Sequence, residues 1–88
     1  MGKEIKILKA LANNKRMEIL NILSQEKDLN VAEIAETIKL HFKSASKHLQ
    51  KLVEAGLIER LQNGFRAEHN LKDNVNELLR VINKLGKS

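Results

Sequence analysis

Residues 31–66 read VAEIAETIKLHFKSASKHLQKLVEAGLIERLQNGFR, and this stretch decides the fold. Its start has the acidic character and apolar spacing of a short helix, and a longer amphipathic helix is expected over about 42–55. A glycine stop at Gly56 and an Asn63-Gly64 hairpin signal follow directly. Two helices joined by a few residues, the second basic and followed by a β-ribbon, are suited to reading a groove of duplex DNA.

The helix expected over 42–55 has an apolar side and a lysine side. Its apolar residues follow the spacing of one inward stripe, i, i+4, i+7 and i+8: Ala45, Leu49, Leu52 and Val53. About 200° around the axis stand the lysines: Lys43, Lys47 and Lys51. Residues 39–51 hold four lysines, two histidines and no acid, although the chain has 11 acids. This local charge favours DNA contact over the alternative, an ordinary solvated helix face.

The part of the chain before residue 31 predicts two more helices. A first helix is expected over about 3–12, and a second begins after an N-cap at Asn13 or Asn14. Asn30, with Glu33 three residues later, resembles a capping box that opens the short acidic helix.

A β-hairpin and a last helix complete the predicted order. The hairpin, or wing, is expected over about 57–71, as short strands at 57–61 and 65–71 around Gln62-Asn63-Gly64, in which Asn-Gly is the hairpin signal. The last helix is expected over about 74–85, and Asn74 with Glu77 has the spacing of a second capping box.

Composition bounds the class of protein. The 88 residues carry a formal charge of +5 with a pI near 9.7, and 42% of them are hydrophobic although only two are aromatic. We therefore expect a single domain over 1–88 with a core of aliphatic side chains. The basic charge suggests a polyanionic partner.

Several functions are excluded by what the sequence lacks. Cysteine is absent, which excludes a disulfide, a thiolate metal site and a thiol nucleophile. No signal segment and no apolar run of about 18 residues occurs, so we expect a cytoplasmic protein without a membrane span. Neither HExxH nor a glycine-rich phosphate loop is present, so an enzyme is not expected.

Three stretches of the chain carry a family resemblance: LANNKRMEIL at 11–20, VAEIA at 31–35 and, above all, SKHLQKLVEAGLI at 46–58. They resemble the ArsR/SmtB family of dimeric winged-helix repressors of bacteria and archaea. The resemblance covers roughly residues 5 to 71. It implies a mainly α, winged helix-turn-helix fold with a small β-hairpin, in the order ααααββα, dimerised through the first and last helices.

The chain also departs from that family. Many members sense a metal or an arsenical through cysteines at the start of the third helix, or zinc through Asp and His of the last helix. Here residues 28–32 read DLNVA and the last helix has no histidine. Both metal sites are missing, so no metal and no cofactor is expected, and the effector is unknown. Residues 41–43 also replace the small polar residues that usually precede the recognition helix.

The basic helix and the resemblance together indicate which residues contact DNA. At the start of the recognition helix, Lys43 and Lys47 can donate to base edges or to flanking phosphates. Ser44 and Ser46 are short enough to approach a backbone oxygen or a base. Lys51 lies farther along and is expected at a phosphate.

Two pairs of cations outside this helix are further candidates. Arg60 and Arg66 flank the expected hairpin tip, where they can enter a minor groove or simply keep a turn soluble. Lys15 and Arg16 stand in the first turn of the second helix, where free N–H groups and two cations can clamp a phosphate. A carboxylate such as that of Glu18 can satisfy Arg16 instead.

The three histidines and Phe42 can be explained without a role in binding a ligand. His41, His48 and His69 lack the helical pairing of a metal site, so metal binding is not expected. Phe42 can touch a thymine methyl group or fill the gap between helices, and its i−3 relation to Ala45 favours the second.

The first and last helices also carry apolar faces. In the last helix this face can cover the domain core or pair with a second copy of the chain, and we favour the second. The expected dimerisation residues are Ile5, Leu8, Val75, Leu78, Leu79, Ile82 and Leu85.

The sequence thus predicts a transcriptional regulator that binds double-stranded DNA sequence-specifically. The predicted form is a homodimeric repressor whose two recognition helices enter successive major grooves of an inverted-repeat operator. The alternative is a winged-helix protein–protein interaction module that docks an acidic partner. RNA binding is less favoured, because two aromatic residues make no stacking platform.

Overall fold

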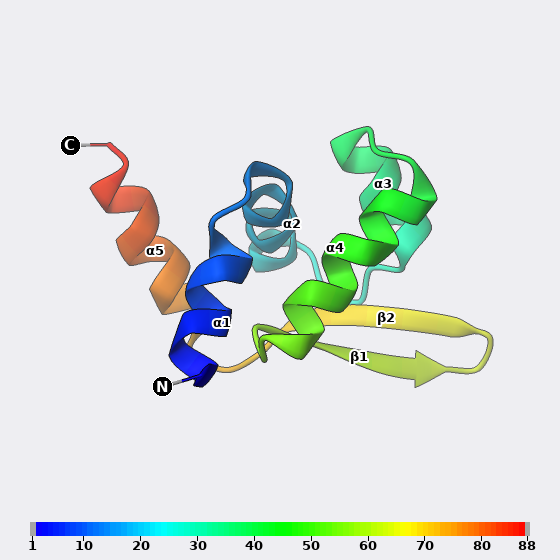
Figure 1. Ribbon diagram of the computed structural model, residues 1–88. Helices are drawn as coiled ribbons and strands as arrows, with labels where there is room; N and C mark the ends of the chain where they lie inside the picture. The colour runs from blue at the N-terminus through cyan, green and yellow to red at the C-terminus, as the bar shows by residue number, and fades with distance from the viewer. Residues whose placement is uncertain (1, 88) are drawn as a thin grey trace.

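Five helices and two strands make up residues 2–87, the part of the chain that this computed structural model describes (Figure 1). The predicted order ααααββα is confirmed, and every boundary lies within about two residues of its expected place. The elements are α1 (Gly2–Leu11), α2 (Asn14–Gln25), α3 (Val31–Ile38), α4 (Phe42–Glu54), β1 (Ile58–Asn63), β2 (Arg66–Leu71) and α5 (Val75–Leu85).

Side-chain caps explain why α2 and α3 begin where they do. The side chain of Asn13 accepts a hydrogen bond from the backbone N–H of Arg16 at 3.0 Å, so Asn13 is the N-cap of α2. Asn30 and Glu33 form the predicted capping box, with reciprocal bonds of 2.8 and 2.9 Å. Two otherwise unsatisfied N–H groups are thereby paired at the start of α3.

The end of α4 is set by Gly56, as predicted. Gly56 has φ +76, the left-handed conformation that L residues with a side chain rarely adopt. The backbone N–H of Leu57 donates to the carbonyl of Leu52, and that of Gly56 to the carbonyl of Val53, both at 3.0 Å. This pair of bonds is a Schellman motif, which turns the chain from the helix directly into the hairpin.

An aliphatic core lies between the helices and the base of the hairpin. Its larger fully buried members come from α2, α3, α4 and β1: Ile19, Leu20, Ile34, Leu52 and Ile58. Phe42 does not contribute, because 60% of its surface is exposed. The expectation that Phe42 fills the gap between helices is therefore wrong.

The inner side of α4 follows the predicted stripe except at its end. Ala45, Leu49 and Leu52 are buried, whereas Val53 is 36% exposed. Val53 lies about 80° from Ala45 around the helix axis, so it falls at the edge of the stripe. The prediction that Val53 points inward is wrong, and its side chain faces the hairpin instead.

The hairpin turn lies one residue later than predicted. Asn63 pairs with Arg66 in the antiparallel register, so the turn residues are Gly64 and Phe65 rather than the expected Gln62, Asn63 and Gly64. Of these two turn residues only Gly64 has a positive φ, +66. This is the pattern of a type II′ turn, which has glycine in its first central position. The side-chain amide of Gln62 donates to the Gly64 carbonyl at 3.0 Å and steadies the turn.

The last helix begins without the expected capping box. Asn74 adopts φ +72 and makes no side-chain cap bond to the first turn of α5. Val75 and Leu79 are buried in the core of the same chain, which anchors the N-terminal half of α5. The C-terminal half runs past the core with its apolar residues more exposed.

The chain termini and the hairpin tip lie at opposite sides of the molecule (Figure 1). Helices α1 and α5, with both termini, lie at one side, and the hairpin extends away from the helices so that its tip is at the opposite side. Helix α4 crosses between these ends with α3 beside it. Within residues 2–87, none of the helices combines the length and the apolar character of a membrane span.

The two glycines that follow helices make a matched test of the α4 stop. Gly56→Ala should destabilise the fold by about 1 kcal/mol, because a Cβ is strained at positive φ although no atom lies within 4 Å of it. Gly86→Ala should cost nothing, since Gly86 has φ −69 and its added Cβ meets only ordinary contacts. Urea denaturation of both variants measures the difference, and equal stabilities would contradict the assigned role of Gly56.

Candidate nucleic-acid interface

The outer face of α4 is a row of lysines. Lys43, Lys47 and Lys51 are exposed, and among residues 2–87 none of the three has an ion-pair partner. The buried stripe on the other side of the helix fixes its rotation, so these ammonium groups point away from the body of the protein. The structure thus brings together the central cations that the sequence predicted. We call this row the lysine face.

The start of α4 adds to the positive potential. His41 occupies the N-cap position but makes no side-chain bond to the first turn. The backbone N–H groups at this end therefore have no side-chain acceptor from the cap, and the helix dipole is positive here. Ser44 is exposed within this first turn, beside Lys43. An anion that reaches this end would meet N–H, hydroxyl and ammonium donors together.

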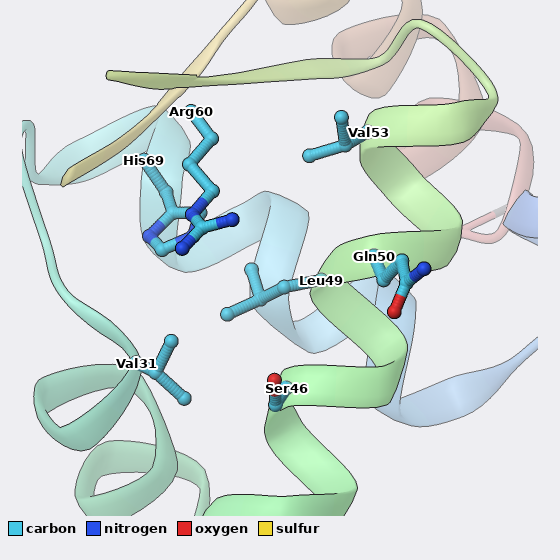
Figure 2. A pocket seen from close by; sticks show the side chains of 7 residues that line it. All are labelled: Val31, Ser46, Leu49, Gln50, Val53, Arg60 and His69. Atoms are coloured by element: carbon cyan, nitrogen blue, oxygen red, sulfur yellow. The ribbon is translucent and has the colours of Figure 1, made fainter. Parts of the chain in front are cut away.

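A concavity of about 290 Å³ separates α4 from the hairpin (Figure 2). Ser46 and Gln50 stand on its α4 side, and Arg60 reaches into it from β1 beside the buried ring of His69. No carboxylate within residues 2–87 pairs with Arg60. This hollow, which we call the wing groove, therefore offers an uncompensated guanidinium next to a hydroxyl and an amide. Its full lining is Val31, Ser46, Leu49, Gln50, Val53, Arg60 and His69.

Arg66 serves a different purpose from Arg60. Its guanidinium forms ion pairs with Glu33 and, at 2.9 Å, with Glu68, and it donates to the backbone carbonyl of Asp28 at 2.8 Å. The bonds to Glu33 and Glu68 raise the pKa of Arg66. The pKa of Glu33 is lowered, first by the N–H of Asn30 and then by Arg66. Arg66 thus fastens the hairpin to the start of α3, and its charge is compensated.

Lys15 and Arg16 also have partners within the chain. Lys15 pairs with Glu18 at 3.2 Å, so the predicted carboxylate serves the neighbouring lysine rather than Arg16. The Arg16 guanidinium donates to the carbonyls of Ala10 at 2.7 Å and Lys9 at 3.2 Å, which close the end of α1. The conformation of Arg16 is therefore accounted for by holding α1 against α2, without a phosphate.

Sequence reasoning missed two lysines of α1. Lys6 and Lys9 line a second concavity, of about 240 Å³, together with Lys51 and Glu54 of α4 and with Arg16. Their nearness to Lys51 is a tertiary contact between distant parts of the chain, and no local pattern of α1 announces it. The lysine face therefore continues from α4 onto α1.

Two of the three histidines are held by the fold. His69 is 1% exposed and its Nδ1 lies 2.9 Å from the Leu29 carbonyl. Burial has the largest effect on the pKa of His69 and lowers it. The bond to the Leu29 carbonyl raises this pKa, and the charge of Arg60 lowers it by a smaller amount. His48 Nδ1 lies 3.4 Å from the Arg16 guanidinium, and burial followed by the Arg16 charge lowers its pKa. No three His, Cys, Asp or Glu side chains of residues 2–87 gather as metal ligands.

The predicted dimerisation residues divide into two groups. Val75 and Leu79 are buried in the core and the half-buried Leu78 packs against it, so these three serve their own chain, whereas Ile82 is half-buried without belonging to that core. The others are exposed, and Val81, which the sequence reasoning missed, joins them at 56% exposure. This exposed apolar set, which we call the end face, consists of Ile5, Leu8, Val81 and Leu85.

Known proteins resemble this chain in both sequence and fold. The family model described as "Bacterial regulatory protein, arsR family" matches residues 13–60, more than half of the chain. A solution structure of the homodimeric winged helix-turn-helix DNA-binding domain of a possible ArsR-family regulator from Mycobacterium bovis is similar, with a TM-score of 0.91 and 29% identity. That match covers 98% of this chain and 80% of the other.

Two further solved structures are similar over nearly their whole length. HlyU from Vibrio cholerae has a TM-score of 0.83 at 26% identity, covering 99% of this chain and 95% of the other. The transcriptional repressor PagR of Bacillus anthracis has a TM-score of 0.81 at 26% identity, covering 92% of this chain and 93% of the other. The predicted winged helix-turn-helix fold is confirmed.

The Arg16–His48 contact predicts how stability depends on pH. Arginine only donates, so Nδ1 of His48 must accept and the ring must be neutral. The lowered pKa means that below about pH 6.5 the unfolded chain takes up a proton which the folded chain resists. Stability should therefore fall from pH 7 to pH 5.5, and less steeply in His48→Gln, which keeps an acceptor without titrating.

Urea midpoints at the two pH values measure this effect. His41→Gln is the matched control, because it removes an exposed histidine that contacts no arginine in residues 2–87, and it should keep the wild-type dependence. If His48→Gln and His41→Gln lost stability equally on acidification, the proposed role of the His48 contact would be refuted.

Proposed function

The chain belongs to the ArsR family of bacterial regulatory proteins, and from this premise we propose that it is a DNA-binding transcriptional regulator acting as a homodimeric repressor. The single observation that carries the proposal is the lysine face: Lys43, Lys47 and Lys51 stand unpaired on a helix whose opposite side is buried. A folded helix that exposes one row of uncompensated cations suits a polyanion with a groove of helix width, which is the major groove of B-DNA.

The position of each group along α4 suggests its role in the major groove. Lys43, Ser44 and Lys47 belong to the N-terminal half, which in helix-turn-helix proteins contacts base edges. Lys51 lies one turn beyond Lys47 and beside Lys9 of α1, so these two are proposed to contact phosphates of the flanking strand.

The wing groove is proposed to hold the sugar–phosphate strand that separates the major from the minor groove. When α4 lies in the major groove, this strand must pass between the helix and the hairpin. Arg60 offers an unpaired guanidinium there, and Ser46 offers a hydroxyl on the α4 side. Arg16, Lys15 and Arg66 are proposed instead to hold the DNA-contacting elements in place, because their charges have partners within the chain.

The end face is proposed as the dimer interface. It combines exposed apolar residues of α1 and α5 at the side of the molecule farthest from the hairpin tip (Figure 1). The Mycobacterium bovis domain with the same fold is a homodimer. A two-fold axis through this face would place two α4 helices in successive major grooves, about 34 Å apart, and would require an inverted-repeat operator. We propose that the protein acts in the cytoplasm, where such an operator is accessible.

Salt dependence tests the proposed function. About four cations per protomer are proposed to neutralise phosphates, which gives about eight per dimer. The logarithm of the binding constant should then fall with the logarithm of salt concentration with a slope of about −7. Lys47→Ala should weaken binding to a duplex selected from a random pool by about tenfold and weaken random duplex less. Lys51→Ala should weaken both duplexes equally and make the slope shallower by about 2.

Fluorescence anisotropy with both duplexes at several salt concentrations provides these values. Lys27→Ala is the control, because Lys27 is exposed in the loop between α2 and α3, away from the lysine face, and should bind as wild type does. A binding constant that does not respond to salt, or an acidic protein bound without any affinity for duplex, would overturn the proposal in favour of an interaction module.

The proposed interface predicts the effect of one charge. Leu8→Glu should place a carboxylate in an apolar contact, so the protein should elute from a sizing column as a monomer. Its affinity for the inverted repeat should fall by about a hundredfold or more, because the two half-sites are no longer bound by linked subunits. Leu61→Glu is the matched control for the sizing measurement, since Leu61 is an exposed leucine on the hairpin, outside the end face. If both variants stayed dimeric, another surface would have to form the dimer.

A further inference from the structure

The tip of the hairpin presents a phenylalanine to solvent. Phe65 is the second turn residue after Gly64, and its side chain is fully exposed. It is one of only two aromatic residues in the chain, and it takes no part in the hydrophobic core. In Figure 1 the tip stands clear of all the helices, so no neighbouring element covers it.

The turn itself does not require an aromatic residue. A type II′ turn needs glycine in its first central position, which Gly64 supplies, and tolerates most residues in the second. The Gln62 amide already steadies the turn through the Gly64 carbonyl. A serine or asparagine at position 65 would serve the turn and would avoid exposing an apolar ring to water. Phe65 therefore has a role outside the folding of the hairpin.

The side chains of Arg60 and Arg66 point away from the tip of the hairpin. Arg66 turns back to Glu33 and Glu68 at the start of α3, and Arg60 points into the wing groove. What remains at the tip is a phenyl ring next to two exposed amide side chains, those of Gln62 and Asn63. An apolar wedge flanked by hydrogen-bonding amides is the chemistry with which proteins part base steps from the minor groove.

The location of the tip also suits this partner. If the strand between the two grooves passes through the wing groove, the hairpin tip reaches the adjacent minor groove. The tip lies opposite the end face, so the proposed dimer leaves it uncovered (Figure 1). A two-fold dimer would therefore carry one such ring at each outer end of its operator.

We propose that Phe65 inserts partly between two base pairs in the minor groove beside each half-site and bends the duplex there. This proposal rests on the proposed function and adds a determinant of specificity to it. Because pyrimidine–purine steps unstack most easily, the wedge favours TA or CA/TG steps at those positions without hydrogen-bonding to them.

The absence of other fluorophores allows a direct test. The chain has no tryptophan and no tyrosine, so Phe65→Trp introduces a single indole at the tip. With a duplex recovered from the random pool by the wild-type protein, this indole should be quenched by stacking and become shielded from acrylamide. Leu61→Trp is the matched control, because it places an indole on the same hairpin away from the tip, where accessibility to acrylamide should persist.

Bending is measured in parallel by energy transfer between dyes at the two ends of the same duplex. Wild type should shorten the end-to-end distance, and Phe65→Leu should keep the bend because leucine can also act as a wedge. Phe65→Ala should lose the bend and about tenfold in affinity, while its unfolding midpoint stays that of wild type because the ring is exposed.

The outcomes separate the two proposals. If wild type binds duplex with the steep salt response described above, but the indole stays accessible and Phe65→Ala bends DNA as wild type does, the wedge is refuted and the regulator stands. If wild type binds no duplex, both are refuted. Shielding by lipid vesicles rather than by duplex would also overturn the wedge.

Discussion

Burial of the inner stripe of α4 is the constraint on which the rest of the structure depends. Ala45, Leu49 and Leu52 pack into an aliphatic core, and their burial fixes the rotation of the helix about its own axis. Since successive residues are about 100° apart, a fixed inner side dictates the outer side as well. The outward row of lysines is therefore a consequence of core packing. A substitution that loosened the packing of this stripe would therefore change the direction in which the lysines point, even with every lysine still present.

The three arginines around α4 and the hairpin divide into two that hold the fold together and one, Arg60, whose charge is uncompensated in the described part of the chain. Arg16 closes the end of α1 and contacts His48 of α4, while Arg66 ties the hairpin to the start of α3. Each joins elements distant in sequence, so together they fix the hairpin and α4 relative to the body. Arg60 has no carboxylate partner within residues 2–87 and faces the wing groove. Arg16, Arg66 and Arg60 thus have different roles in the structure, although each is an ordinary surface cation in the sequence.

The sequence predicted most of the fold because its signals are local. Capping at Asn30, the glycine stop at Gly56 and the apolar stripe of α4 each depend on residues a few positions apart. The turn was misplaced by one residue because both Asn-Gly and Gly-Phe are compatible with a two-residue hairpin. Only pairing across the whole ladder decides between them, and it places Asn63 opposite Arg66.

The candidate site was less predictable than the fold. The lysine face follows from helical periodicity, so it could be read from spacing. The ion pair of Arg66 with Glu33 and the nearness of Lys9 to Lys51 could not, because both arise only through tertiary packing. Similarly, an apolar residue of α5 can face the core or a second copy, and spacing alone does not distinguish these. Burial of Val75 in its own chain shows that part of the expected dimer face is core.

The kind of cation on α4 bears on how such a protein would distinguish sequences. Lysine is a flexible point donor, whereas arginine can form the planar bidentate contact that best identifies guanine. In this chain α4 carries lysines only, and the arginines nearest to it either hold the fold or face the wing groove. Direct readout by α4 would then discriminate less than a bidentate contact does. Symmetry of the half-sites and the ease of bending at the wing tips would supply the remainder, which gives Phe65 a role that lysines cannot fill.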